Sequence, residues 1–163
     1  MRVIDLAFPI KPHFRWRVGT ELGSSHVRGD LFQTTMLTIH CHAFTHVDAP
    51  VHFLPGGRDV AELPVDQWVG DAAVVDLTHV EDNAEVTAAH LEQQAQHVRP
   101  GDIALLRTDW PKRASVDTER FWAVVEYLTN LDQIGVPRCR FVALPLPVQG
   151  ADGSPVRAVA IVE

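Results

Sequence analysis

The sequence predicts a single α+β domain over residues 1–163, mostly β-sheet with one or two helices. The prediction rests on three observations. Most apolar segments have the short length and composition of strands, and only one segment has clear helical spacing. A chain of 163 residues can bury one hydrophobic core but not two. A hydrophobic content of 46% and a charged content of 21% are ordinary for a globular domain.

Six segments are expected to be strands, namely residues 3–6, 31–42, 71–77, 103–107, 141–144 and 156–162. The second alternates in side-chain character, which places His40 and His42 on one face of the strand. The third is apolar throughout and is expected to be covered on both faces. These strands would form the sheet at the centre of the domain.

The clearest helix is expected over residues 81–98, with an apolar stripe of Val86, Leu91, Ala95 and Val98. Thr87 is a possible N-cap, and the Pro100-Gly101 pair ends the segment. Residues 121–128 could form a second short helix or a strand. Residues 11–29 have no periodicity and are expected to be an irregular functional or interfacial segment.

Charge and composition exclude several classes of protein. The net charge of −7 and the lack of a basic stripe argue against a nucleic-acid partner. No apolar run approaches the length of a membrane span, and the N-terminus has no signal-peptide pattern. Two cysteines are too few for a disulfide framework, so a cytoplasmic location is expected.

The segment from residue 40 to residue 53 is the most informative, because it holds four of the nine histidines together with Asp48. His42 and His46 are four residues apart and Asp48 follows two residues later, so all three could face one point if a strand runs into a loop. Imidazole nitrogens and a carboxylate oxygen are donors that zinc accepts. The alternatives are a histidine-rich surface loop or hydrogen-bonded core histidines. The combination favours a metal site.

Residues 42–52, HAFTHVDAPVH, resemble the His-x-Gly-Thr-His-x-Asp-x-Pro-x-His signature of the putative cyclase family, best known from bacterial kynurenine formamidase. Phe44 replaces the glycine of that signature. Residues 101–110 are similar to the family's Gly-Asp-x-x-Leu-x-Arg-Thr-Gly-Trp strand, residues 126–131 to its Glu-Asn-Leu-Thr-Asn-Leu, and residues 144–158 to its closing hairpin. The resemblance implies a swivelling β/β/α domain that assembles into dimers or tetramers.

The resemblance also implies roles for individual residues. The positions matching His42, His46 and Asp48 bind one metal, Asp48 and Glu126 help to hold a second, and His52 is the acid/base. A further histidine ligand of the family lies in a segment before Glu126 that is absent here, so the chain resembles a shortened member. Glu126 could then move to the first metal, His40 could substitute as an extra ligand, or the site could be a relict.

We therefore expect a metal-dependent hydrolase of a small amide or ester/lactone, with water bound to the metal as nucleophile. The cofactor is expected to be zinc, with manganese or another divalent metal possible. A pocket for the small carbonyl substrate is expected around Phe14, Trp16, Phe44 and Thr45. Phe44 would fill a turn where glycine leaves room for substrate or permits an unusual backbone angle.

Two other functions stay open: a metal-dependent cyclase or dehydratase (a lyase) acting on a small carbonyl compound in secondary metabolism, and an inactive metal-binding homologue. A homodimer or larger homo-oligomer is expected, because the missing segment would leave apolar surface uncovered.

Overall fold

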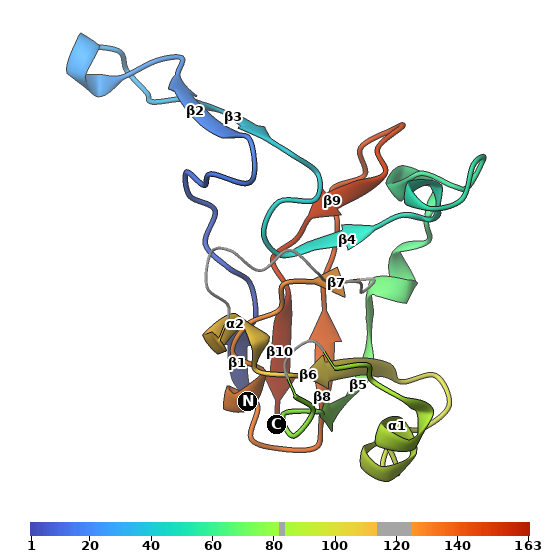
Figure 1. Ribbon diagram of the computed structural model, residues 1–163. Coiled ribbons are helices and arrows are strands. Elements are labelled where there is room, and N and C mark those ends of the chain that lie inside the picture. Colours follow the sequence, from blue (N-terminus) through green and yellow to red (C-terminus); the bar gives the residue numbers. More distant parts are fainter. Residues whose placement is uncertain (82–83, 114–124) are drawn as a thin grey trace.

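The computed structural model describes residues 1–81, 84–113 and 125–163. The strands of this part of the chain form three groups: a five-stranded sheet, a three-stranded sheet and a two-stranded hairpin (Figure 1). Short helices connect them. The expectation of an α+β domain dominated by strands is confirmed.

The five-stranded sheet has the order β1-β10-β8-β5-β6, formed by β1 (Arg2–Asp5), β10 (Val159–Val162), β8 (Arg138–Val142), β5 (Val69–Asp76) and β6 (Ile103–Arg107). Neighbouring strands are antiparallel except β5 and β6, which are parallel. A parallel pair needs a crossover connection, and this one contains helix α1 (Ala88–Gln94). Five of the six expected strands thus lie in this sheet, with ends shifted by a few residues.

Strand β5 buries side chains on both faces, as its apolar run predicts. Ala72 belongs to the main core, together with Leu6, Leu105 and Phe141. Val75 belongs to a smaller cluster on which Leu91 and other residues of the helical segment pack. The sheet is therefore the middle layer at this end of the domain.

The predicted helix over residues 81–98 is wrong in extent, because the observed helix covers only Ala88–Gln94. Thr87 is the N-cap, as expected, and its hydroxyl accepts a hydrogen bond from the His90 amide. This cap starts the helix beyond Val86, which is 38% exposed and lies outside the apolar stripe. After the helix, His97 donates from Nε2 to the Val74 carbonyl, 2.9 Å away, so the chain there binds strand β5 instead of continuing the helix.

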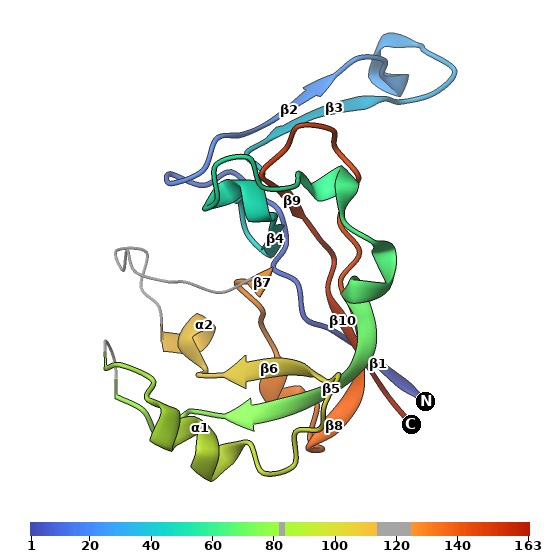
Figure 2. The same ribbon diagram turned by 90° about the vertical axis from the view of Figure 1, so that its right-hand side faces the viewer.

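The predicted strand over residues 31–42 is also too long. Only β3 (Thr35–Ile39) forms, and it pairs with β2 (Val18–Leu22), which lies in the segment expected to be irregular. The strand ends at Ile39 because residues 40–43 turn, with the Ala43 amide donating to the His40 carbonyl. The tip of this hairpin carries the short 3-10 helix η1 (His26–Arg28). Figure 2 shows the hairpin projecting from the opposite end of the molecule to β5 and β6.

The three-stranded sheet lies between the hairpin and the large sheet and has the order β7-β4-β9. It is formed by β4 (His46–Asp48), β7 (Val125–Glu126) and β9 (Gly153–Pro155), all antiparallel. Residues 121–124 lie outside the described part of the chain, so of the segment 121–128 only the short strand β7 can be compared. Val47 at the centre of β4 is fully buried and belongs to the main core.

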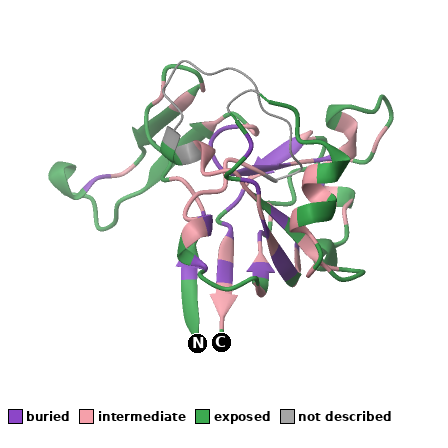
Figure 3. Cartoon of the chain, turned by 60° about the horizontal axis from the view of Figure 1, so that its bottom comes forward, coloured by how far each residue is buried: buried purple, intermediate pink, exposed green. Residues whose placement is uncertain are grey.

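The remaining elements are short: α2 (Trp110–Arg113) and the 3-10 helices η2 (Pro50–His52), η3 (Val60–Glu62), η4 (Val65–Trp68) and η5 (Leu131–Gln133). In the three described stretches, no helix has the length and apolar character needed to cross a membrane. Figure 3 shows that the buried residues gather in the strands of the two larger sheets, whereas the β2–β3 hairpin at the left is mostly exposed.

Candidate metal centre

Three side chains that can bind a metal converge at strand β4. His46 and Asp48 share one face of the strand because Val47 between them points to the core. His42 reaches the same place from the turn before the strand. One possible ligand atom from each of the three residues lies within 4.8 Å of the others.

The environment of His46 leaves the lone pair of its Nε2 atom available to bind a cation. The side chain is buried, and Nδ1 donates to the Phe44 carbonyl, 2.7 Å away, so in the neutral ring Nε2 carries the lone pair. This Nε2 lies 3.4 Å from Asp48 Oδ1 and 3.7 Å from Glu126 Oε2. Burial works to lower the pKa of His46, but the Asp48 carboxylate and the Phe44 carbonyl outweigh it, and the pKa is raised.

Asp48 is held as a carboxylate by its two histidine neighbours. Burial works to raise the pKa of Asp48, but the imidazoles of His46 and His42 outweigh it, and the pKa lies below its ordinary value. His42 Nδ1 donates to Asp48 Oδ1 over 2.7 Å. The aspartate is therefore available as an anionic ligand near neutral pH.

The second ring nitrogen of His42 faces a carboxylate outside this first group of ligands. His42 Nε2 lies 2.9 Å from Asp152 Oδ2, but this contact lacks hydrogen-bond geometry. The nitrogen is buried and has no hydrogen-bond partner in the part of the chain that the structure describes. A neutral imidazole has one proton, so it cannot donate to carboxylates on both of its sides. A cation here would remove the conflict.

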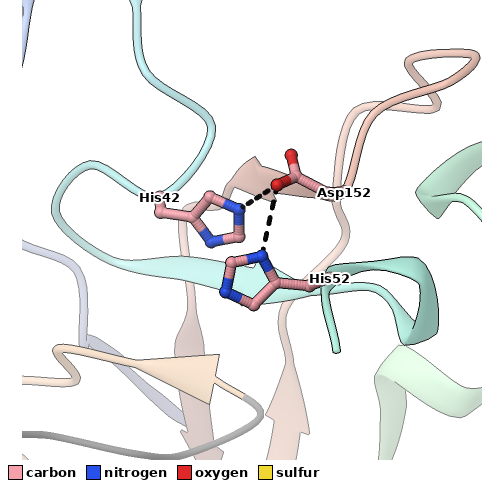
Figure 4. A group of neighbouring side chains, drawn as sticks. All are labelled: His42, His52 and Asp152. Atoms are coloured by element: carbon pink, nitrogen blue, oxygen red, sulfur yellow. Dashed lines mark hydrogen bonds and ion pairs between the residues drawn. The ribbon is translucent and has the colours of Figure 1, made fainter. Parts of the chain in front are cut away.

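A second group of possible ligands, His42, His52 and Asp152, adjoins the first (Figure 4). His52 ends helix η2, and Asp152 lies in the turn before β9. His52 Nδ1 donates to Asp152 Oδ2 over 3.2 Å, and the rings of His42 and His52 lie 4.0 Å apart. His42 therefore belongs to both groups.

The turn before β9 is built to approach His42 closely. The Ala49 amide donates to the Asp152 carbonyl, and Gly153 pairs with Asp48 across the strands. A Cβ atom on Gly153 would lie 2.6 Å from the Val47 carbonyl oxygen and 2.8 Å from His42 Cε1. Only glycine fits here, because any side chain would displace the ring of His42.

The other predicted ligands occupy different positions. Glu126 on β7 pairs with His46 across the strands, which brings its carboxylate to the edge of the first group. His40 belongs to neither group. Its ring lies 5.6 Å from that of His42, but its Nδ1 accepts a hydrogen bond from the His42 amide in the turn that follows β3.

The predicted pocket residues divide into three environments. Phe14 is 69% exposed. Trp16 and buried Phe44 form an aromatic pair with centroids 4.7 Å apart. Thr45 is buried, and its hydroxyl donates to the Tyr127 carbonyl and accepts from the Phe8 amide, so its proton is already used.

Two further aromatic residues, which were not predicted from the sequence, extend the Trp16–Phe44 pair into an aromatic wall. Tyr127 stacks edge-on with Trp16 at 5.2 Å and with Trp110 at 5.5 Å, and its ring lies 6.1 Å from that of His46. Trp110 and Tyr127 both lie in segments that resemble motifs of the family, and this resemblance was the one sequence feature that could have identified them. The wall therefore adjoins the candidate ligands directly.

Three residues with positive φ mark departures from the family pattern described above. Phe44 has a φ of 58° and Asp109 a φ of 52°, where that pattern has glycine. Tyr127 has a φ of 56°, where the pattern has asparagine. Phe44 therefore has the positive φ that glycine adopts at low cost, which agrees with one of the two roles expected for glycine here, and it adds an aromatic ring at this position.

Comparison with known proteins assigns the family. The sequence model described as putative cyclase matches residues 4–145. The chain belongs to the putative cyclase family. The kynurenine formamidase of Bacillus cereus is 31% identical over 162 residues, covering 76% of this chain and 77% of that protein. The kynurenine formamidase of Salinibacter ruber is 29% identical, with the same coverage.

Solved structures agree on the fold. Isatin hydrolase A from Labrenzia aggregata superimposes with a TM-score of 0.81 at 22% identity, over 99% of this chain and 94% of that chain. A structure titled as a potential metal-dependent hydrolase with cyclase activity gives a TM-score of 0.68 at 21% identity, over 98% and 96%. The cyclase-like fold is therefore confirmed.

The coverage figures also bear on the missing segment. The Bacillus cereus alignment extends over 162 residues but takes in only 76% of a 163-residue chain, so the relative has residues inside the aligned stretch with no counterpart here. This agrees with the shortened member expected from the sequence.

Proposed function

We propose that this chain is a zinc-dependent hydrolase of a small amide, ester or lactone. The observation that carries the proposal is the His42, His46 and Asp48 group, in which the buried His46 Nε2 lies 3.4 Å from Asp48 Oδ1 and 3.7 Å from Glu126 Oε2. Membership in the putative cyclase family and the hydrolase names of its relatives support it. Glu126 would complete the anionic side of the site.

The residues of the chain have separate tasks in this proposal. When bound, zinc would polarise the substrate carbonyl and make a water molecule more acidic. His52 takes the proton that the attacking water loses and returns it to the leaving nitrogen or oxygen, which general acid/base catalysis requires. Trp16, Phe44 and Tyr127 form a wall against which a flat substrate can lie.

The substrate panel follows from the names of the relatives. Kynurenine formamidase and isatin hydrolase motivate an aryl formamide and isatin as first probes. An aryl ester, a lactone and a β-hydroxy carbonyl compound extend the panel to the remaining hydrolase classes and to dehydration. Turnover of the last compound alone would favour the lyase alternative.

The test compares zinc-loaded wild type with His46→Ala and His52→Ala, using exposed His79→Ala as the matched control. His46→Ala should lose both zinc and activity. His52→Ala should keep zinc and lose about 10²–10⁴-fold in turnover, the usual contribution of a general base. His79→Ala should match wild type. A fully zinc-loaded wild type that hydrolyses none of the panel would refute the proposal.

We also propose that the chain forms a homodimer or larger homo-oligomer through hairpin β2–β3. Leu37 pairs with Thr20 and Leu22 with Thr35, so Leu22 and Leu37 lie on one face, with Val18 and Ile39. Leu22 is 53% exposed and Leu37 is 50% exposed. An isolated two-stranded hairpin is marginally stable in water, so an apolar face of this kind favours a covering partner.

A second apolar region, away from the hairpin, would supply a further contact in a larger homo-oligomer. A cavity of about 770 Å³ adjoins β5 and β6, lined by Leu77, Leu91, Leu105 and other apolar residues, with Glu126 and Tyr127 at its wall. Apolar surface was expected where the family's segment is missing. Sedimentation at micromolar concentration tests the assembly, and a monomer would refute it.

A further inference from the structure

Asp152 was not among the predicted site residues, yet its carboxylate contacts two of them. Oδ2 lies 3.2 Å from His52 Nδ1 and 2.9 Å from His42 Nε2 (Figure 4). His42 is a candidate metal ligand and His52 is the candidate acid/base. The same oxygen atom of Asp152 therefore contacts one residue of each role.

The backbone fixes the position of this carboxylate. The Asp152 carbonyl accepts a hydrogen bond from the Ala49 amide over 2.9 Å, and the neighbouring Ala151 carbonyl accepts one from the Val60 amide over 3.0 Å. The next residue, Gly153, begins β9 and pairs with Asp48. The turn is thus attached to the same strand that carries the candidate ligands, and Asp152 has little freedom to move independently of them.

An ionised carboxylate accepts hydrogen bonds and donates none. A carboxylate facing His52 Nδ1 selects the form of the neutral ring in which Nδ1 carries the proton. The lone pair then lies on Nε2, which Figure 4 shows on the side of the ring away from Asp152.

We propose that Asp152 is a positioning residue that holds His52 in the Nδ1–H form, with Nε2 ready to accept a proton. This inference rests on the proposed function, because only an acid/base role for His52 gives the selected form a catalytic consequence. Asp152 does not touch the substrate in this proposal. It acts through His52, as carboxylates that orient a histidine base do in other hydrolases.

The experiment uses Asp152→Asn and Asp152→Ala, both zinc-loaded. Asp76→Asn is the matched control, because Asp76 has the same 47% side-chain exposure as Asp152 and lies on β5. The ring nitrogens of His52 are observed by ¹⁵N NMR and assigned from the His52→Gln spectrum. Wild type and Asp76→Asn should show a protonated Nδ1, whereas both Asp152 variants should shift towards a protonated Nε2.

Zinc content and kinetics complete the test. The Asp152 variants should still bind zinc in the wild-type ratio, and kcat on the best panel substrate should fall about 10–100-fold with little change in KM. Asp152→Glu should recover part of the loss. Loss of the zinc would make Asp152 a ligand and overturn the inference, as would an unchanged His52 spectrum or an unchanged kcat.

The spectrum does not depend on turnover. A wild type with no activity refutes the proposed function, while the ¹⁵N comparison still shows whether Asp152 controls the protonated position on His52.

Discussion

The two small sheets of this protein have opposite environments, although both consist of short strands. The three-stranded sheet has strands of two or three residues, yet His46 is 1% exposed and Val47 is fully buried. The hairpin has two five-residue strands, yet Met36 is 64% exposed and Leu37 is 50% exposed. Contact with the main core, and not strand length, therefore accounts for which of the two sheets is buried.

This difference also explains where the chemistry lies. Strand β4 has a partner on each side and the core beneath Val47, so its polar face can hold several ionisable groups in fixed positions. The hairpin has no neighbouring strand beyond its own pair in the described part of the chain. Its apolar face is suited to association instead.

The largest expected effect is the loss of self-association when the apolar face of the hairpin is changed. Leu37→Lys places a charge on its apolar face and should weaken self-association by at least about 100-fold, a loss in the range of interface hot spots. Thr38→Lys adds the same charge to the opposite face and is the matched control. Sedimentation of the two variants over a range of concentrations measures the difference, and equal weakening in both would show that the apolar face is not the contact.

A matched pair of valines compares the two sheets directly. Val47→Ala should lower the free energy of unfolding by about 2 kcal/mol, because it removes buried methyl groups and leaves a cavity. Val27→Ala, at the 96% exposed hairpin tip, should change it by less than about 0.5 kcal/mol. Urea unfolding of both variants checks the prediction. Similar losses at the two positions would mean that the hairpin tip is packed in solution.

Backbone strain beside the site gives a smaller and more specific effect. Glycine usually destabilises a protein relative to alanine, but Phe44 has a φ of 58°, where alanine pays the same steric cost as phenylalanine. Phe44→Gly should therefore be more stable than Phe44→Ala by about 1 kcal/mol. Thermal unfolding of the two variants tests this reversal, and the usual order would show that the positive φ is not kept.

The sequence predicted the strands of the large sheet better than those of the two small sheets. Strands of the large sheet were found because long apolar runs, as in β5 and β6, leave a clear signal. Strands β4 and β9 were missed as strands because three residues carry no period. Strand β2 lacks an apolar run of its own, and its pairing with β3 creates the face that matters.

The candidate site shows a similar limit. His42, His46 and Asp48 were selected because they lie close together in sequence and match a family signature. Asp152 lies 100 residues after His52 in the chain and reaches it only through the pairing of β9 with β4, which spacing cannot reveal. Tyr127 was recognised as part of a motif, but its contact with Trp16 depends on the tertiary fold.

The smallest expected effect lies in the large sheet that supports the site. The Arg138 guanidinium lowers the pKa of Asp102 to about 2. Because this pKa is depressed, the stabilisation is present above the ordinary value of 3.8 and is lost as the pH falls towards about 2. Asp102→Asn should reduce stability at pH 7 and have little effect near pH 2. Unfolding curves at both pH values check the sign, and an equal loss at each would contradict it.

On the proposed function, the sheet of β7, β4 and β9 holds a divalent metal through His42, His46 and Asp48. Calorimetric titration of metal-free protein with zinc tests this binding, with His46→Ala as the comparison. Wild type should bind about one zinc per chain, because the family's further histidine ligand is absent, and the variant should bind none. Two tightly bound ions per chain, or equal binding by His46→Ala, would contradict it.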